Sequence, residues 1–298
     1  MTTATVHPWK IRDRVFHWGD RTYVMGVLNV TPDSFSDGGQ FNTVATALQQ
    51  ARRLVEVGCD MLDVGGQSTR PGAGDISPEV EMQRVVPIIN AIRAHEDEAL
   101  ANTIISIDTT RAAVARAAVR AGANIVNDIS GGTFDEAMFS TVADLGVPVV
   151  LMHIRGTPAT MQQYTDYKDL IGEIYAFLER QIETAIAAGL SQSQIAIDPG
   201  IGFAKSYSQN LELLRQIPAF RALNCPILIG PSRKSFLGWL LQRPNPQERV
   251  WGTAAACCAA IAGGADILRV HDGQEMMDVC RVADAIWRDR LPDHCQEV

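Results

Sequence analysis

The sequence lacks long apolar runs and has few aromatic residues. Aromatic side chains are 6% of its 298 residues. No apolar stretch reaches the roughly 18 residues that a membrane-spanning helix needs. The N-terminal segment MTTATVHPWKIRDRV also lacks the apolar core that marks a secretory signal. We therefore expect a cytoplasmic protein without a membrane partner.

The sequence also has only six cysteines, and its basic residues are fewer than its acidic residues. The six cysteines form no CxxC pair and none stands at zinc-ligand spacing from a histidine, so neither a disulfide framework nor a zinc site is predicted. Reduced, mostly buried cysteines are expected, as in cytosolic proteins. The net charge of −8 argues against nucleic acid as a partner. A few well-placed arginines can still bind an anionic small molecule.

Apolar strands that end at a polar residue are the most informative feature that is present. Seven such runs occur, with polar ends at Asn29, Asp108, Asn127, His153, Asp198, Ser232–Lys234, and Arg269 with His271. Strands buried on both faces are apolar inside, so their polar residues collect at one end. If the strands run parallel, these ends share one rim, which is where an α/β barrel keeps its chemistry.

A helix-glycine-strand unit recurs along the chain. Five helical stretches end at a glycine and are followed by an apolar strand; the glycines are Gly58, Gly122, Gly146, Gly189, and Gly263 or Gly264. Glycine just past a helix can close it with a positive φ. Repeated units of this kind predict a parallel sheet with helices outside. We predict eight strands, at about residues 22–29, 60–65, 103–108, 124–128, 147–153, 195–198, 226–230 and 266–270.

These units predict a single α/β domain over residues 1–298, a (β/α)8 TIM barrel. An N-terminal extension over residues 1–21 precedes it, and a hairpin turning at His17–Asp20 is expected to close the lower end. Helices are expected over 43–57 and from Ser77 onwards. The rival fold is an open doubly wound sheet, but its phosphate fingerprints, GxGxxG and GxxxxGK[ST], are missing.

Two polar, turn-rich loops follow the first two predicted strands, in the strings LNVTPDSFSDGG and GGQSTRPG. They are followed in order by SIDT, NDISGG, LMH with RGTP, DPGIGFAK, SRKS and RVHD, which together span about residues 28–272. In these motifs the chain resembles the dihydropteroate synthases. The resemblance implies a (β/α)8 barrel that joins 7,8-dihydropterin-6-methyl diphosphate to 4-aminobenzoate and releases diphosphate. It also implies Mg²⁺ as cofactor and a homodimer.

The pterin of that reaction presents a flat edge of N–H donors, for which carboxylate and amide oxygens are natural partners. Asp198 and Asn127 suit this task, and Asp108 is placed to stabilise the positive charge that develops as diphosphate leaves. Each residue also has a structural reading: Asp198 as the cap of the following turn, Asn127 as a structural amide, and Asp108 as a helix cap. The resemblance implies a pterin pocket made of Asp108, Asn127, Met152, Asp198, Phe203, Gly230 and Lys234.

The diphosphate requires cations, and arginine binds phosphate oxygens in a bidentate fork. The residues expected to bind diphosphate are Asn29, Arg70, Arg269 and His271. The resemblance implies that Asn29 also holds Mg²⁺, an ion that takes few protein ligands beside phosphate and water. Aminobenzoate is expected to contact Phe35, Asp37, Thr69, Pro71, Phe203 and Ser235. The catalytic candidates are Asp108, Lys234, Arg70 and Asn29.

Several further readings follow from the motifs. His153 is interpreted as structural, because an aniline nucleophile is already neutral and needs no strong base. Ser232 is expected to cap the helix beside Lys234. The chain departs from the usual family pattern at Gln67, where glutamate is common, and at Ala204, where GFGK is usual.

Two other functions stay open at this point. A pterin-binding methyltransferase that serves a corrinoid shares the barrel and the pterin pocket, but it has no need of diphosphate ligands. A non-catalytic pterin-binding protein would need only Asn127 and Asp198, and could dispense with Asn29 or Arg70. The presence of all four residues favours the synthase.

Overall fold

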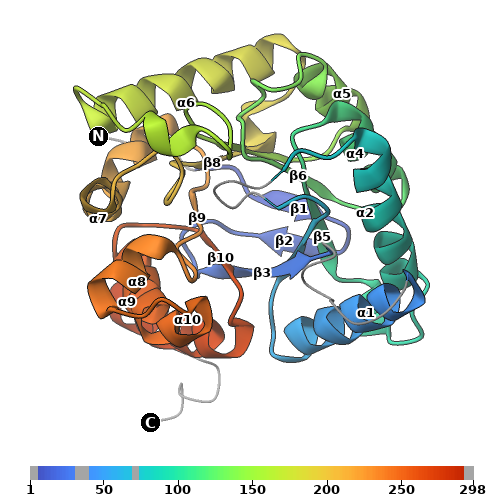
Figure 1. Ribbon diagram of the computed structural model, residues 1–298. Helices are drawn as coiled ribbons and strands as arrows, with labels where there is room; N and C mark the ends of the chain where they lie inside the picture. Colours follow the sequence, from blue (N-terminus) through green and yellow to red (C-terminus); the bar gives the residue numbers. More distant parts are fainter. Residues whose placement is uncertain (1–5, 31–39, 69–73, 292–298) are drawn as a thin grey trace.

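Eight parallel strands form a nearly closed barrel in the computed structural model, which describes residues 6–30, 40–68 and 74–291 (Figure 1). The strands are β3 (Tyr23–Asn29), β4 (Met61–Gly65), β5 (Ile104–Asp108), β6 (Ile125–Asp128), β7 (Val149–Met152), β8 (Ile195–Asp198), β9 (Leu228–Ile229) and β10 (Ile267–Val270). The two ends of the sheet meet where the Ile197 N–H donates to the Pro226 carbonyl at 2.9 Å. The predicted barrel is therefore confirmed, and every predicted strand is present with its ends shifted by at most two residues.

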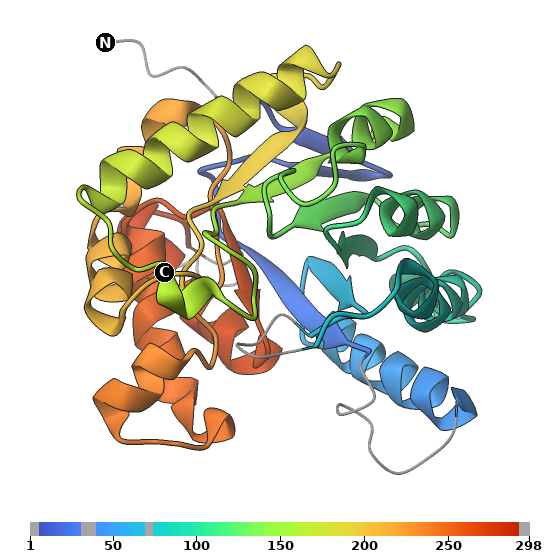
Figure 2. The same cartoon turned by 45° about the horizontal axis from the view of Figure 1, so that its top comes forward.

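Helices cover the outside of the barrel in chain order (Figure 2). Their bounds are α1 (Gln40–Glu56), α2 (Pro78–Arg93), α3 (Glu98–Ala101), α4 (Ala112–Arg120), α5 (Met138–Leu145), α6 (Leu170–Ala187), α7 (Tyr207–Arg215), α8 (Ser235–Leu241), α9 (Val250–Ala262) and α10 (Gly273–Trp287). Ser77 caps α2 as predicted, since its side chain accepts the Val80 N–H. After α9 it is Gly264, at φ +92°, that takes the left-handed conformation. None of the helices in the described ranges has the length and apolar character needed to span a membrane.

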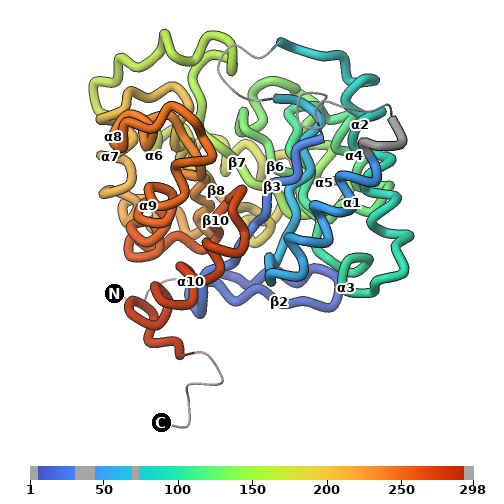
Figure 3. The backbone as a smooth tube through the Cα atoms, turned by 60° about the horizontal axis from the view of Figure 1, so that its bottom comes forward, coloured from blue at the N-terminus to red at the C-terminus, as the bar shows by residue number. Residues whose placement is uncertain are grey.

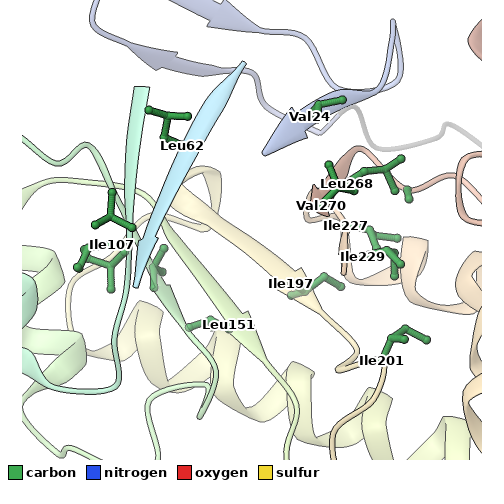
Figure 4. Packing of buried hydrophobic residues seen from close by; sticks show 14 of the residues in the cluster. Val24, Leu62, Ile107, Leu151, Ile197, Ile201, Ile227, Ile229, Leu268 and Val270 are labelled. Carbon is green, nitrogen blue, oxygen red and sulfur yellow. The ribbon is translucent and has the colours of Figure 1, made fainter. Parts of the chain in front are cut away.

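Alternation of side chains along the strands divides the apolar residues between two cores. Outward-facing residues such as Val24, Leu62 and Leu151 pack beneath the helices (Figure 4). Inward-facing residues fill the lower part of the barrel; they are Met25, Met61, Ile104, Ile125, Val150, Ala196, Leu228 and Ile267. Because successive side chains point to opposite faces, residues two and four positions further along each strand also face inward. Those upper positions are occupied largely by polar residues.

A two-stranded hairpin closes the lower end of the barrel, as predicted (Figure 3). It pairs β1 (Trp9–Ile11) with β2 (Arg14–Phe16). Its apolar side chains pack directly on the inward-facing residues of the lower barrel. The hairpin therefore belongs to the core of the domain and is no separate appendage.

The predicted position of the hairpin turn is wrong. The chain reverses at Arg12–Asp13, where Arg12 has φ +55°, and not at His17–Asp20. The reason is packing: the Trp18 ring lies 5.2 Å from that of Trp9 and 5.9 Å from that of Phe16, which holds this segment against the hairpin. The His17–Asp20 segment still forms a turn, in which the Asp20 N–H donates to the His17 carbonyl at 3.4 Å, but this turn leads from β2 to β3 and does not close the hairpin.

We predict that Phe16→Ala lowers the free energy of unfolding by about 3–5 kcal/mol, because a buried ring at the base of the barrel is lost. Denaturant unfolding should still show one transition. Val15→Ala on the same strand is the matched control; Val15 is 44% exposed, so its change should stay within about 0.5 kcal/mol. A separate early transition, or an equal effect of both substitutions, would contradict the conclusion that the hairpin is part of the barrel core.

Candidate active site

The parallel register sets the polar strand ends side by side. Asn29 on β3 is opposite Gly65 on β4, Gly65 is opposite Asp108 on β5, and Asp108 is opposite Asn127 on β6. Gly65 has no side chain to fill the space between its neighbours. A Cβ atom there would lie 3.5 Å from the Asp108 Cβ and 3.7 Å from the Asn29 Oδ1. The register therefore forms a continuous polar wall with room in front of it.

The opposite wall comes from the strands and loops of the second half of the barrel. Met152 on β7 is opposite Asp198 on β8. Met152 packs with Phe203 in a small apolar cluster above the strands. Lys234 Nζ lies 4.0 Å from the centre of the Phe203 ring, a cation–π contact. Gly230 keeps the adjoining position small, since a Cβ there would come within 3.6 Å of the Arg269 Cβ.

A single guanidinium joins three strands at the mouth. Arg269 Nε donates to Asp63 Oδ2 at 2.6 Å, and its Nη2 donates to Asp108 Oδ2 at 2.7 Å. Asn127 Nδ2 also donates to Asp63 Oδ2, at 3.1 Å, which leaves the amide oxygen of Asn127 as a potential acceptor. Two carboxylates, one guanidinium and one amide therefore form a connected network. Asp108 is no helix cap, because the N-cap position of α4 is Arg111, whose N–H is accepted by the Thr109 hydroxyl.

Asp63 is a site residue that motif reading missed. It is fully buried, and its Oδ1 has no hydrogen-bond partner among the described residues. The Ser106 hydroxyl, which lies on the neighbouring strand at the paired position, is likewise buried without a partner. A signal was available in the sequence: a carboxylate inside the apolar strand MLDVG requires a buried partner. Two unpaired polar atoms at paired positions therefore leave hydrogen-bonding capacity in the barrel interior below the mouth.

Burial controls the protonation of the acids at the mouth. It raises the pKa of Asp108 to about 7, although the Arg269 guanidinium acts in the opposite direction. It raises the pKa of Asp198 to about 6, against the Gly200 N–H that donates to Asp198 Oδ1 at 2.7 Å. Asp198 thus caps the turn with one oxygen and keeps the other available.

Burial also acts on the lysine of the SRKS motif. It lowers the pKa of Lys234 to about 8, and the nearby Arg269 lowers it further, whereas Asp198 and Asp108 favour the charged form. These opposing influences show that the charged groups of both walls converge on one space. Lys234 is therefore a cation that can release its proton close to neutral pH.

His153 has a structural environment, in keeping with its interpretation. It is 2% exposed, and its Nδ1 lies 3.2 Å from the ammonium of Lys205, which is equally buried. Burial lowers the pKa of His153 to about 2, and the charges of Lys205 and Arg155 reinforce that shift, so the ring is neutral. Lys205 also donates to the Phe203 carbonyl at 2.9 Å. The pair supports the turn after Asp198 from below.

Ser232 does not cap the helix after Lys234, contrary to prediction. Helix α8 begins at Ser235, and Lys234 precedes it without any side-chain cap. The Ser232 hydroxyl accepts the His271 N–H at 3.1 Å and lies 3.0 Å from the His271 Nδ1. Ser232 therefore ties the loop after β9 to the end of β10.

Gln67, the first departure from the family pattern, belongs to a network around Arg111. Arg111 Nη1 donates to Gln67 Oε1 at 2.6 Å and also binds the Glu81 carboxylate, while its Nη2 contacts Asp75. Glu81 is almost fully buried. A neutral side chain at position 67 avoids a third carboxylate in this group, so the departure leaves the network intact.

Ala204, the second departure, has φ +50°, a conformation that favours glycine. A non-glycine residue there costs about 1–2 kcal/mol. Its methyl group is fully buried against Met152 and Phe203, and burying one such carbon contributes about 0.8 kcal/mol. The two effects partly offset, which explains how the chain tolerates alanine here.

The structure thus brings together most of the predicted site residues. Those at the barrel mouth are Asn29, Asp108, Asn127, Met152, Asp198, Phe203, Gly230, Lys234, Arg269 and His271. Ser235 is exposed at the start of α8. Five predicted residues lie outside the described part of the chain: Phe35, Asp37, Thr69, Arg70 and Pro71.

A cavity of about 590 Å³ lies beside the mouth, with Asp108, Arg111, Ile129 and Phe134 in its walls; of the residues expected in the pterin pocket, Asp108 alone lines it. This volume lies in the range of roughly 300–1,000 Å³ that small-molecule sites occupy. The described residues contain no group of three or more His, Cys, Asp or Glu side chains arranged for a metal ion. A metal here would need oxygens of other kinds.

Comparison with known proteins agrees with this geometry. The profile of the family described as pterin binding enzyme matches residues 25–271. A dihydropteroate synthase of Synechocystis sp. is 55% identical over 281 residues, which cover 94% of this chain and 96% of that relative. The chain belongs to the dihydropteroate synthase family.

Solved structures of the dihydropteroate synthase family share the fold over nearly the whole chain. The Xanthomonas albilineans enzyme with 4-aminobenzoic acid has a TM-score of 0.87 and 40% identity, and the match covers 97% of this chain and all of that one. The same enzyme in complex with 7,8-dihydropteroate has a TM-score of 0.81 and 36% identity, and covers 96% of this chain and 99% of that one.

We predict that Arg269→Met lowers the free energy of unfolding by about 3–5 kcal/mol at pH 8, because two buried carboxylates lose their cation. The loss should shrink towards pH 5. Without the guanidinium the folded-state pKa of Asp108 rises further above its unfolded value, so its protonated form stabilises the variant at low pH. Denaturant unfolding at pH 5, 6, 7 and 8 measures this trend.

The control for that prediction is Arg281→Met, which removes an exposed ion pair with Asp278 on α10. Its effect should remain under about 1 kcal/mol at every pH. An equal loss at pH 5 and pH 8 in Arg269→Met would show that the carboxylates do not govern the stability of this region.

Proposed function

We propose that the barrel joins 7,8-dihydropterin-6-methyl diphosphate to 4-aminobenzoate, forming 7,8-dihydropteroate and releasing diphosphate. One observation carries the proposal: acceptors and cations from six strands and from the loop after β9 converge at one mouth in a chain 55% identical to a dihydropteroate synthase. The reaction makes the chain a transferase of folate synthesis. The named relatives that hold 4-aminobenzoic acid and 7,8-dihydropteroate support both the second substrate and the product.

The pterin pocket is assigned to residues that offer acceptors around a flat space. The free oxygen of Asp198 and the Asn127 amide oxygen accept N–H groups of the pterin edge. Asp198 is largely ionised at neutral pH, because its pKa is about 6, and an ionised acceptor strengthens these bonds. Met152 and Phe203 supply apolar surface for the ring faces, and Lys234 lies over Phe203.

Asp108 stabilises the positive charge on the pterin methylene as its bond to the diphosphate oxygen breaks. The aminobenzoate nitrogen attacks this carbon, a C–N bond forms, and the nitrogen then loses a proton to solvent. Asp108 transfers no proton itself, so its contribution is electrostatic, about 3–4 kcal/mol for a preorganised group of this kind. Its contact with Arg269 fixes the carboxylate in place before the charge develops.

Diphosphate is assigned to Asn29, Arg70, Arg269 and His271. Arg269 has five N–H donors and directs two of its nitrogens at carboxylates, so others stay available for phosphate oxygens. Asn29 fits Mg²⁺, since its hard amide oxygen faces the open space beside Gly65. When bound, Mg²⁺ would neutralise charge on the leaving group.

Aminobenzoate is assigned to Phe35, Asp37, Thr69, Pro71, Phe203 and Ser235.

A homodimer is supported by exposed apolar residues on helices α7 to α10, which lie next to one another on one side of the barrel (Figure 1). Its exposed residues are Tyr207, Trp239, Leu240, Leu241, Trp251, Val282, Ile286 and Trp287. Large exposed apolar side chains gathered on neighbouring helices are typical of protein interfaces. A cytoplasmic location fits the free thiols of Cys59, Cys225, Cys257, Cys258 and Cys280.

The reaction itself is the first test. Purified protein with both substrates and Mg²⁺ should yield equal amounts of dihydropteroate and diphosphate, measured by chromatography. No product from protein that unfolds cooperatively would reject the proposal. Corrinoid-dependent demethylation in its place would favour the methyltransferase alternative.

Variants then separate binding from turnover. Asp198→Asn should weaken pterin binding roughly tenfold to a hundredfold in calorimetry, as expected for a lost charged hydrogen bond of about 1.5–3 kcal/mol. Arg70→Ala should mainly reduce kcat, because its cation acts on the leaving diphosphate. Asp266→Asn is the control: this buried acid lies at the opposite end of a barrel strand, where it accepts the Ile227 N–H, and its loss should leave pterin affinity unchanged. Equal loss of pterin affinity in Asp198→Asn and Arg70→Ala would contradict the division of roles.

A further inference from the structure

Arg249 is a buried arginine that has no carboxylate partner among the described residues. It ends the short 3₁₀ helix η5 (Pro246–Arg249) and is 8% exposed. Its guanidinium donates only to backbone carbonyls: Nη1 to Arg233 at 2.8 Å, Nε to Arg243 at 2.9 Å and Nη2 to Pro244. A buried cation is costly unless its donors are satisfied, so these carbonyls are required partners. Only a planar fork of donors can reach three of them at once.

Helix α8 is shaped to admit this guanidinium. A Cβ atom on Gly238 would lie 2.5 Å from the Arg249 Nε and 2.6 Å from its Cζ. Glycine is therefore the residue that lets α8 lie directly against the side chain. The Gly238 carbonyl also accepts the Arg243 N–H at 2.8 Å, which closes the segment after α8 around the same group.

Both the backbone N–H and the backbone carbonyl of Arg233 are hydrogen-bonded to this region. Its φ is +58°, a left-handed conformation that costs a non-glycine residue about 1–2 kcal/mol. Its N–H donates to the Thr253 Oγ1 at 3.0 Å, and its carbonyl accepts from Arg249. Thr253, on α9, is fully buried. Such a conformation persists only where the surroundings fix it, and here α9 and its preceding turn do so.

The residues that follow Arg233 are those assigned to the two substrates. Lys234 extends over the Phe203 ring, and Ser235 begins α8. The direction in which both side chains leave the backbone depends on the conformation of the preceding residue. Neither Arg249 nor Thr253 is among the residues assigned to a substrate.

We propose that Arg249 and Thr253 are positioning residues: they fix the backbone of Arg233 and thereby aim Lys234 at the pterin and Ser235 at aminobenzoate. The inference rests on the proposed function. It adds two residues, both from outside the loop that carries the contacts, on which the affinity for both substrates depends.

Two pairs of variants test the inference. Thr253→Val keeps the shape and removes the acceptor, whereas Thr253→Ser keeps the hydroxyl. Thr253→Val and Arg249→Lys should lower kcat/KM for aminobenzoate roughly ten- to a hundredfold, since a displacement of about 1 Å can cost about a hundredfold. Thr253→Ser should remain close to the wild type. Should Arg249→Lys fail to fold, the two Thr253 variants decide the question.

Arg93 provides the matched control. It too has no carboxylate partner among the described residues. It donates to the backbone carbonyls of Ala101, Thr103 and Gly122 and to the side-chain amide oxygen of Asn124, but at the lower end of the barrel. Arg93→Lys should lower the melting temperature as Arg249→Lys does, yet leave both KM values unchanged. Unchanged KM values in folded Thr253→Val and Arg249→Lys, or an equal rise in Arg93→Lys, would overturn the inference.

Calorimetry with a pterin separates this inference from the proposed function. If the wild type binds pterin but forms no dihydropteroate, the proposed function fails while the positioning role is still measured. Thr253→Val should then weaken pterin binding about tenfold, a loss that Arg93→Lys should not share. Equal pterin affinity in all three proteins would overturn the positioning role by itself.

Discussion

The mouth of the barrel depends on one partly buried cation that neutralises two buried carboxylates. Arg269 comes from the last strand of the chain, and its partners Asp63 and Asp108 are 206 and 161 residues earlier. Two carboxylates in a low-dielectric interior repel each other and lose their hydration, so neither is tolerated there without a cation. The closed barrel provides that cation, because β10 lies beside β3. Asp63 on β4 is then two strands away from β10, and Asp108 on β5 is three strands away. The closure of the fold and the charge balance of the site are therefore one constraint.

This balance suits the ligand that we propose, which carries charges of both signs. In the proposed reaction the diphosphate would bring negative charge to Arg269 and His271, and positive charge would develop on the carbon assigned to Asp108. The unpaired oxygen of Asp63 and the hydroxyl of Ser106 leave polar capacity deeper in the barrel. An apolar floor closed by the hairpin lies below, so the polar layer is confined to the upper end.

Much of this arrangement could be predicted from the sequence, because strand ends and side-chain alternation are local properties. The apolar runs located all eight strands, and their polar ends identified Asn29, Asp108, Asn127 and Asp198. What could not be predicted depends on partners distant in the chain. The hydroxyl of Ser232 accepts the His271 N–H and does not cap the adjacent helix. The buried carboxylate of Asp63 is paired with Arg269, a residue of the last strand. The hairpin turn was misplaced because the chain turns at both Arg12–Asp13 and His17–Asp20, and the pairing of β1 with β2 decides which of the two closes the hairpin.

The central claim is that residues from opposite walls of the barrel hold one flat ring at its mouth. The most direct measurement is a crystal structure of the chain soaked with the pterin diphosphate and Mg²⁺. We expect the N–H edge of the ring on the oxygens of Asn127 and Asp198, with the methylene carbon beside Asp108. A pterin bound outside the barrel mouth, or one that contacts neither Asn127 nor Asp198, would contradict the claim.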